Sequence, residues 1–527
     1  MAIHEDQTLQ ALVDRIIPAD EYASGWQAGV GDFIQRILTT DLADSIPFVT
    51  DGLKLVQQES HARHNHTDFA HLLPETQDAL IADLLANKIS VDWTVSATAF
   101  INLIIRLSIQ GFYSDPENGG NRDALAWEMI NYHLEQKATS WPAIDTTPPP
   151  TISWETLHNN YEIIIVGAGA GGGVAACALA EAGHRVLLIE RGDWLTTMTL
   201  RRDHLRNQRT MQGYDTPAGP PSAGNSRVYK TSAGTATVPP TDFRWNNNAM
   251  TVGGGTRVFG AQAWRFCPED FRMAGMYGVP TGSSLADWPI SYEELAPYYD
   301  RAEWELGVSG DPAGNRFAGR RSRNYPMPPL QSGTSVAVLS KGARALHWNS
   351  SPVPLLINSV ARDGRAACLH CGTCVGFGCP AEAKNGTHNT VIPRAITTGR
   401  CDVLINTQVE RLMTNSDGVV TGVSLVTDTD GTIQRRIVDA DHVILCAGAI
   451  ETARLLLNST SIQEPNGIGN NHDQVGRNLQ GHVYTGALGI FDEPVQDGFG
   501  PGPAISLNDY RHYNENIIGG GMLANEF

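Results

Sequence analysis

Residues 161–190 hold the pattern that most restricts the fold of this chain. An apolar, β-rich run at 161–166 leads directly into glycines at positions 167, 169, 171 and 172, and a second apolar run follows at 185–189. In a parallel strand–helix–strand unit the first glycine permits a tight turn, the second lets backbone amides approach a pyrophosphate, and the third allows close helix packing. The pattern therefore predicts a dinucleotide site, with Gly167, Gly169 and Gly172 in its phosphate loop.

The second strand of this unit ends in Glu190, 23 residues beyond Gly167. A carboxylate near this spacing accepts hydrogen bonds from an adenosine ribose and disfavours a 2′-phosphate. We therefore expect Glu190 and its neighbour Arg191 to contact FAD or NAD rather than NADP, and the periodicity leaves FAD and NAD open. The same glycines interrupt the uncharged stretch 163–180, which we interpret as strand, turn and helix rather than as a membrane span.

Length and charge restrict the architecture and the partners. A chain of 527 residues exceeds what one hydrophobic core usually serves, so at least two domains are expected. The net charge of −18 would repel a polyanion, so we expect no nucleic-acid partner. Residues 1–6 show no cationic region leading into an apolar core, so no secretory signal is visible and a cytoplasmic location is expected.

The first 140 residues are expected to form an all-α domain. Apolar residues recur there at helical spacing, with Thr8 as the predicted N-cap of the first helix and Pro18 as its stop. A proline-rich linker is expected at 141–160, since the prolines at 148–150 cannot continue a helix. Beyond it, short runs between 403 and 445 with intervening Asp-Gly turns predict a sheet meander.

Several motifs of the N-terminal domain resemble the small-subunit family of gluconate 2-dehydrogenase. They are Ile-Pro-Ala-Asp at 17–20, Gly-Phe-Tyr-Ser-Asp-Pro at 111–116, Gly-Gly-Asn-Arg-Asp at 119–123, and Trp127. The resemblance covers most of residues 1–135. It implies a partner module for a flavin subunit.

The remainder of the chain resembles the glucose-methanol-choline (GMC) oxidoreductases. The matching segments follow the family order: a glycine-rich segment at 250–256, Asp-Trp-Pro-Ile-Ser-Tyr at 287–292, Cys-Ala-Gly-Ala at 446–449, and Val-Gly-Arg-Asn-Leu-Gln at 475–480. The resemblance implies an α/β fold over 161–527, in which a Rossmann-like FAD-binding domain and an α+β substrate domain are interleaved. It also implies FAD contacts at Gly253, Gly254, Gly255, Val409, Ala447 and Gly448.

The resemblance further implies an enzyme that oxidises the CH–OH group of an alcohol, polyol or sugar. Hydride passes from carbon to flavin, a base removes the hydroxyl proton, and a separate electron acceptor reoxidises the flavin. The substrate pocket is expected around 281–395 and 483–527. Two alternatives stay open: a non-catalytic flavin-binding or electron-transfer subunit, and an NAD-dependent dehydrogenase.

Four of the eight cysteines lie within twelve residues. They are Cys368, Cys371, Cys374 and Cys379, in the spacing C-x2-C-x2-C-x4-C-P. This run differs by one residue from a ferredoxin run, so one hypothesis is an iron–sulfur cluster that passes electrons outward. Related alcohol oxidases have a similar stretch without a cluster, so the other hypothesis is that Gly376, Gly378 and Lys384 shape the flavin cavity.

We assign no catalytic residue from the sequence. The family continues past the segment at 475–480 through a substrate-domain sheet to a C-terminal stretch with the catalytic histidines, whereas only 45 residues follow His482 here. We therefore expect this chain to lack its C-terminal part and its catalytic base. His388, His482 and His512 match none of the family's catalytic positions, so polar or core roles are expected for them.

Overall fold

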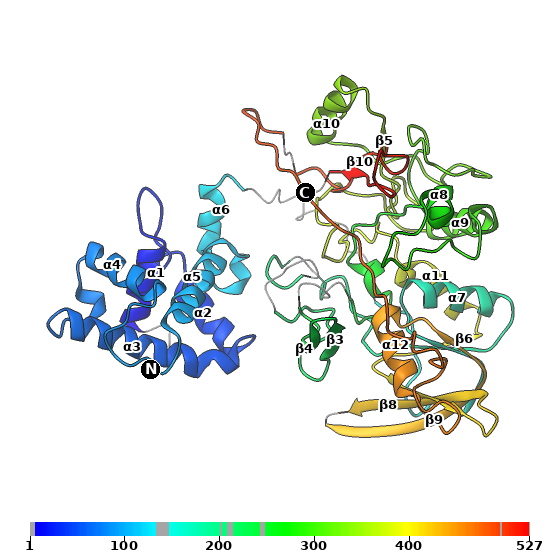
Figure 1. Cartoon of the computed structure of the whole chain (residues 1–527), viewed down its shortest axis with the longest axis horizontal. Helices are drawn as coiled ribbons and strands as arrows, with labels where there is room; N and C mark the ends of the chain where they lie inside the picture. Colours follow the sequence, from blue (N-terminus) through cyan, green and yellow to red (C-terminus); the bar gives the residue numbers. More distant parts are fainter. Residues whose placement is uncertain are drawn as a thin grey trace. The chain divides into compact units, whose positions relative to one another are not determined.

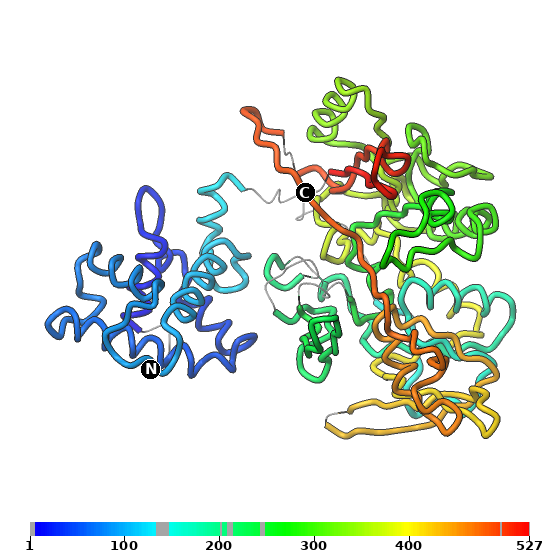
Figure 2. Tube along the Cα trace, viewed as in Figure 1, coloured from blue at the N-terminus to red at the C-terminus, as the bar shows by residue number. Residues whose placement is uncertain are grey.

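The computed structural model describes residues 6–132, 147–200, 203–207, 214–242, 248–429, 431–495 and 498–525. These residues belong to two compact units, which can be followed along the chain in Figures 1 and 2. The first unit comprises Met1–Gln136, Asp203–Arg206 and Thr210–Asp215, and the second comprises Lys137–Arg202, Asn207–Arg209 and Thr216–Phe527. The helical unit therefore includes two short segments from far along the chain.

The first unit is all-α in its described residues, as the sequence predicts. Its helices are α1 (Gln7–Ile16), α2 (Val30–Thr39), α3 (Ile46–Arg63), α4 (Pro74–Leu85), α5 (Ala97–Tyr113) and α6 (Leu125–Met129), with 3-10 turns at Ala43–Ser45, Phe69–His71, Pro116–Asn118 and Arg122–Ala124. The cap predicted at Thr8 is wrong. The Asp6 carboxylate instead accepts hydrogen bonds from the amides of Thr8 (2.8 Å) and Leu9 (3.1 Å), so α1 begins two residues earlier than predicted.

Helix α5 packs against helices α1 to α4 and supplies much of the core of this unit. Glycines make the close approaches: a Cβ on Gly52 of α3 would lie 2.1 Å from the Phe100 ring, and one on Gly111 would lie 2.8 Å from the Phe33 ring. Aromatic rings therefore fill the space that side chains at these two positions would occupy.

A fully buried carboxylate, Glu59, fixes the loop between α4 and α5. Its Oε1 accepts hydrogen bonds from the amides of Ser90 (2.7 Å) and Val91 (3.0 Å) and from the Trp93 indole (3.1 Å). Its Oε2 lies 2.8 Å from Nε of Arg63. Burial alone would raise the pKa of Glu59, but these donors outweigh it and lower the pKa, so the buried group is ionised.

We predict that Glu59→Ala destabilises the helical unit by about 3–5 kcal/mol, because it leaves two loop amides and the Trp93 indole without their acceptor and removes one of the two carboxylates that pair with Arg63. Hydrogen exchange of the α3 and α5 amides in the full chain measures the loss. The matched control is Asp51→Ala in the same helix, which removes an exposed pair with Lys54. Equal exchange in the two variants would contradict the prediction.

The second unit is built on a six-stranded sheet in the order β6-β2-β1-β9-β8-β7. Strands β6, β2, β1 and β9 pair in parallel, and β8 pairs antiparallel with both β7 and β9. The predicted meander is therefore β7 to β9, whereas Val403 lies in β6, on the parallel side. The strands are β1 (Asn160–Val166), β2 (Val186–Ile189), β6 (Cys401–Leu404), β7 (Gln408–Thr414), β8 (Val420–Thr429) and β9 (Thr432–Leu445).

Smaller elements complete the second unit. Its other strands are β3 (Arg227–Thr231) with β4 (Gly234–Val238), and β5 (Ser350–Pro352) with β10 (Ile505–Leu507) and β11 (Leu523–Ala524). Its helices are α7 (Ala170–Glu181), α8 (Met273–Tyr277), α9 (Tyr292–Leu306), α10 (Thr334–Ala345), α11 (Val391–Thr397) and α12 (Gly448–Asn458), with 3-10 turns at Gly254–Arg257, Pro268–Arg272 and Thr387–Asn389. The fold is the predicted α/β type. Among the described residues, no helix has the length and apolar character to span a membrane.

Candidate dinucleotide site

The sheet brings three predicted segments to one edge. In the register of the parallel strands, Val166 at the end of β1 is the partner of both Ile189 of β2 and Leu445 of β9. The residues that follow these strands are Gly167, Glu190 and Cys446, so they leave the sheet side by side. Ligands of open α/β sheets bind at this carboxyl edge.

The glycines of the phosphate loop have two different roles. Gly167 has φ +100°, and a Cβ there would lie 2.5 Å from the Cys446 carbonyl oxygen. A Cβ on Gly172 would lie 1.8 Å from the Gly167 carbonyl oxygen, so helix α7 packs directly on the turn. At Gly169, by contrast, a Cβ would meet no heavy atom within 4 Å. Gly169 therefore faces open space at the N-terminus of α7, where amides and the helix dipole favour an anion.

The second glycine segment lies against this loop. Gly253 N donates to the Ala168 carbonyl at 2.8 Å. Gly254, at φ +52°, is so close that a Cβ would lie 3.0 Å from the Gly169 Cα. Two segments about 85 positions apart in sequence are thus joined backbone to backbone.

Glu190 is buried beside the loop and holds its backbone. Its two oxygens accept hydrogen bonds from the amides of Ala168 and Gly192, each at 3.0 Å. Burial raises the pKa of Glu190, although these amide donors and the nearby Arg191 act in the opposite direction. The carboxylate therefore organises the turn as well as lining the cavity described next.

The loop, the second glycine segment and the sheet edge enclose a cavity of about 330 Å³. Most of the predicted cofactor residues line it: Gly167, Gly169, Glu190, Arg191, Gly254, Gly255, Val409, Ala447 and Gly448. Gly172 and Gly253 do not, because the first packs under the turn and the second packs on Arg257 and His388. Their requirement for glycine comes from packing, not from exposure to the cavity.

One face of helix α12 also lines the cavity, which was not predicted from the sequence. Helix α12 contributes Glu451, Arg454, Leu455 and Asn458. Their spacing of three and four residues is the signal by which the sequence could have revealed this face. Further lining residues not predicted include Asn248, Ala249, Met250 and Gln408.

Three arginines form ion pairs with the Glu451 carboxylate of helix α12. Glu451 lies 3.8 Å from Arg191, 3.7 Å from Arg227 and 3.3 Å from Arg454. Arg191, Arg454 and Glu451 line the cavity, as do the carboxylates of Glu190 and Glu410. The two guanidinium groups in the lining can pair with an anionic ligand.

A buried polar cluster supports the second glycine segment from behind. His388 Nε2 lies 3.4 Å from Glu382, whose carboxylate also accepts hydrogen bonds from Thr197 and Asn389. Burial and the neighbouring Arg257 lower the pKa of His388 to about 4. Burial alone would raise the pKa of Glu382, but the hydrogen bonds lower it to about 2. At neutral pH the histidine is neutral and the carboxylate is ionised.

The four cysteines predicted as metal ligands are all free thiols. Within the described chain, no three of them have sulfur atoms within 4.8 Å of one another. Burial raises the pKa of Cys368 to about 12 and also raises the pKa of Cys374 and Cys379. As arranged, these residues do not fit a cluster, and iron–sulfur ligation stays a prediction.

Lys384 organises the cysteine loop. Its buried Nζ donates to the carbonyls of Phe259 (3.1 Å), Cys374 (2.6 Å) and Phe377 (2.8 Å). These bonds join the loop to the segment that follows the second glycine cluster. Gly376, Gly378 and Lys384 are not among the residues that line the cavity, so the hypothesis that they shape the flavin cavity stays a prediction.

The three candidate histidines do not line the cavity. His388 belongs to the buried cluster, and His482 is exposed. His512 is buried, with Nε2 at 3.1 Å from Asp270 and Nδ1 at 3.1 Å from the Tyr277 hydroxyl. We assign no catalytic base.

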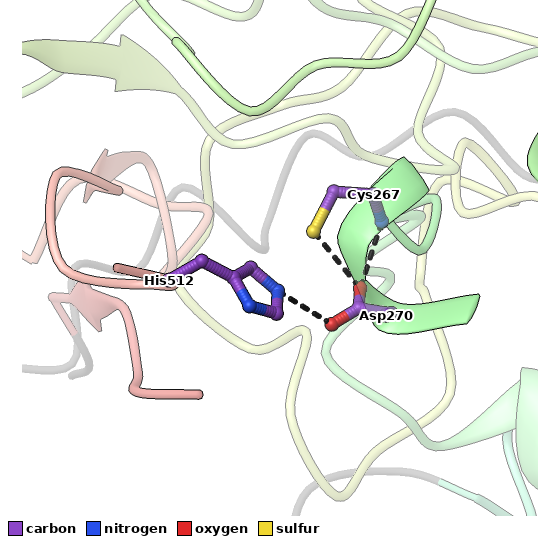
Figure 3. A group of neighbouring side chains, drawn as sticks. All are labelled: Cys267, Asp270 and His512. Atoms are coloured by element: carbon purple, nitrogen blue, oxygen red, sulfur yellow. Dashed lines mark hydrogen bonds and ion pairs between the residues drawn. The ribbon is translucent and has the colours of Figure 1, made fainter. Parts of the chain in front are cut away.

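Cys267, Asp270 and His512 form a compact group that the sequence did not reveal (Figure 3). Cys267 Sγ donates to Asp270 Oδ2 at 3.1 Å, and Arg511 pairs with the same oxygen at 3.2 Å. Burial, above all, raises the pKa of the Cys267 thiol to about 12. The potential ligand atoms lie within 4.8 Å of one another, and Asp270 is already paired with Arg511. The group ties the C-terminal segment to the turn at Pro268–Arg272.

Family models match both parts of the chain. The model described as GMC oxidoreductase matches residues 161–484, and the model described as gluconate 2-dehydrogenase subunit 3 matches residues 3–133. Both resemblances stated from sequence motifs are therefore confirmed.

Three named relatives each match about 70% of this chain. The fructose dehydrogenase large subunit of Gluconobacter japonicus is 30% identical over 68% of this chain and 65% of its own length. Paromamine 6'-oxidase of Streptomyces fradiae is 30% identical over 71% of this chain and 62% of its own. The 2-methyl-1,2-propanediol dehydrogenase of Mycolicibacterium austroafricanum is 30% identical over 68% of this chain and 62% of its own. The match thus spans less than two thirds of each relative.

We predict that two alanine substitutions in the phosphate loop affect different properties, one the stability of the fold and the other the binding of the dinucleotide. Gly172→Ala drives a methyl group into a carbonyl oxygen and lowers the thermal midpoint, because overpacking costs about 1–3 kcal/mol or more. Gly169→Ala leaves the midpoint close to that of the parent, since its methyl group meets open space, but weakens dinucleotide binding. Thermal unfolding and flavin titration measure the two effects. A matching loss of stability in both variants would refute the assignment of these roles.

The buried cluster predicts a loss of stability in acid. The folded pKa of His388 is about 4, whereas an unperturbed histidine has a pKa of about 6.5, so stability falls as the pH drops between these values. The contribution of Glu382 is present above its unfolded pKa and is lost as the pH falls toward about 2.

We expect His388→Asn to flatten the dependence of the thermal midpoint on pH between about 6.5 and 4. His184→Asn, at an exposed histidine of the same unit, is the control and should leave the dependence unchanged. Identical pH profiles for the parent and His388→Asn would show that His388 does not titrate as inferred.

Proposed function

Because the chain belongs to the GMC oxidoreductase family, we propose that it is an FAD-dependent oxidoreductase acting on the CH–OH group of an alcohol, polyol or sugar. FAD, when bound, supplies the acceptor for the hydride that leaves the alcohol carbon. A separate electron acceptor is the second substrate.

The observation that carries the proposal is the contact between Gly254 and Gly169. It places the family's second glycine segment on the phosphate loop, at a cavity that Ala447 and Gly448 also line. The glycines on this side of the cavity suit an anionic dinucleotide, because backbone amides can approach a diphosphate where side chains are absent.

The chain's own residues divide the work of holding FAD. Glu190 is positioned to accept hydrogen bonds from the adenosine ribose. The amides at the start of α7 and the guanidinium groups of Arg191 and Arg454 suit the diphosphate. Val409 offers backbone contacts to the adenine, as the family resemblance implies.

The substrate class rests on the family and on the relatives. Their names include fructose, paromamine and 2-methyl-1,2-propanediol, which are all hydroxylated compounds. A polyol, a sugar or another alcohol is therefore the proposed substrate. The helical unit, which matches gluconate 2-dehydrogenase subunit 3, is proposed as its partner module in the same chain.

We predict that the full-length chain binds FAD and that Glu190→Ala weakens this binding by about 1.5–3 kcal/mol, as expected for hydrogen bonds to a charged group. Flavin fluorescence titration measures the affinity. Glu162→Ala is the matched control, since Glu162 is an exposed carboxylate on the adjoining strand β1. A chain that takes up no flavin would overturn the proposal and favour an NAD-dependent enzyme.

Catalysis is tested separately by anaerobic reduction of the bound flavin with a panel of sugars, polyols, sterols and long-chain alcohols. Bleaching of the flavin by any member supports the enzyme and identifies its substrate class. FAD binding without bleaching by any of them favours the alternative of a non-catalytic flavin-binding or electron-transfer subunit. Iron analysis of anaerobically purified protein tests the iron–sulfur hypothesis for that alternative.

A further inference from the structure

A short segment from the flavoprotein part of the sequence belongs to the helical unit. Residues Asp203–Arg206 and Tyr214 lie with the helices, although the chain on either side of the segment belongs to the second unit. The Asp203 carboxylate accepts hydrogen bonds from the amides of Leu205 (2.8 Å) and Arg206 (3.2 Å), which fixes the turn that presents their side chains.

Arg206 makes the central polar contact. Its guanidinium meets both carboxylate oxygens of Asp41, at 3.2 and 2.8 Å, and also donates to Asn118 at 2.5 Å. The side chains of Arg206 and Asp41 are only 16% and 13% exposed, so the pair is largely shielded from water. The neighbouring Arg206 lowers the pKa of Asp41 despite its burial. Such a two-pronged pair specifies position as well as charge.

His204 occupies a second polar site. Both its amide nitrogen (2.7 Å) and its Nδ1 (2.8 Å) lie against the Asp115 carboxylate. Its ring packs edge-on against Trp127 and Tyr132, with centroids 5.9 and 6.2 Å away.

Apolar burial completes the contact. Leu205 is 5% exposed and Tyr214 is 4% exposed, and both belong to the hydrophobic core of the helical unit. The Tyr214 hydroxyl donates to the Gln110 side chain at 2.6 Å. The segment thus inserts side chains into the helical core instead of lying on its surface.

We propose that this face of the helical unit, formed by Asp41, Gln110, Asp115, Asn118, Trp127 and Tyr132, is a peptide-recognition site whose ligand is formed by residues 203–206 and Tyr214. The site binds the segment strongly enough to keep the helical part and the flavoprotein part together after the linker between them is cut. Asp115 and Trp127 belong to the motifs that mark the subunit-3 family, so the proposal also gives those residues a function. It does not depend on the proposed enzymatic activity.

The experiment uses the full chain with a specific protease site inserted at 141–151. After cleavage, the two fragments are expected to co-elute in size-exclusion chromatography. Arg206→Asp or Asp41→Arg alone should separate them, since loss of a buried charge pair weakens an association on the order of 30-fold or more. The double variant Asp41→Arg with Arg206→Asp reverses the pair and should restore co-elution.

The control is Arg435→Asp, which breaks an exposed pair with Glu410 within the flavoprotein part and should not affect co-elution. Circular dichroism checks that each variant keeps its helices. As a second measurement, a synthetic peptide of residues 200–216 should displace the flavoprotein fragment from the helical fragment. Separation of the cleaved parent chain, or persistent co-elution of Arg206→Asp without competition by the peptide, would overturn the proposal.

Discussion

Backbone meets backbone at the turn that follows β1, and the candidate site depends on this close approach. A Cβ on Gly172 would collide with the Gly167 carbonyl oxygen at 1.8 Å, and one on Gly254 would lie only 3.0 Å from the Gly169 Cα. The approach brings the second glycine segment to the phosphate loop, and glycines of both segments line the cavity. The geometry of the site therefore depends on glycine at a few positions, because only a residue without a Cβ lets the two backbone segments come this close.

Where the chain leaves regular structure, buried charges hold it. Glu59 and Glu190 accept hydrogen bonds from loop amides, and Lys384 donates to three loop carbonyls. An isolated buried charge is costly, so each of these groups stabilises the fold only in the one loop conformation that satisfies it. Loops around the helical core and around the cavity are thereby fixed without secondary structure.

The sequence predicts what is local and misses what joins distant segments. The unit β1-α7-β2 follows from glycine spacing and apolar runs, because neighbours in the chain determine it. The spacing on α12 would also have indicated a lining face. No local pattern, however, reveals that His388 is buried behind Gly253, or that Arg206 pairs with Asp41, 165 residues away. Gly172 and Gly253 are predicted as cofactor contacts but do not line the cavity. The sequence alone does not distinguish a glycine required for packing from one that faces a ligand.

In the contact between the helical unit and residues 203–206 and Tyr214, apolar and charged side chains contribute differently. The apolar ones supply affinity and the charged ones supply specificity. Burying Leu205 and Tyr214 supplies a non-directional gain, which any apolar surface of similar shape could provide. The pairs of Arg206 with Asp41 and of His204 with Asp115 add little net energy once their desolvation is counted, but they penalise any segment that lacks a matching donor at the same place. Asp41 and Asp115 lie in the helical unit, and their partners Arg206 and His204 lie two residues apart in one turn. The ion pairs therefore determine which residues of the segment face which part of the helical unit, and the buried apolar side chains stabilise that arrangement. A shift of one residue would separate Arg206 from Asp41 and His204 from Asp115, so the two pairs favour a single register of the segment.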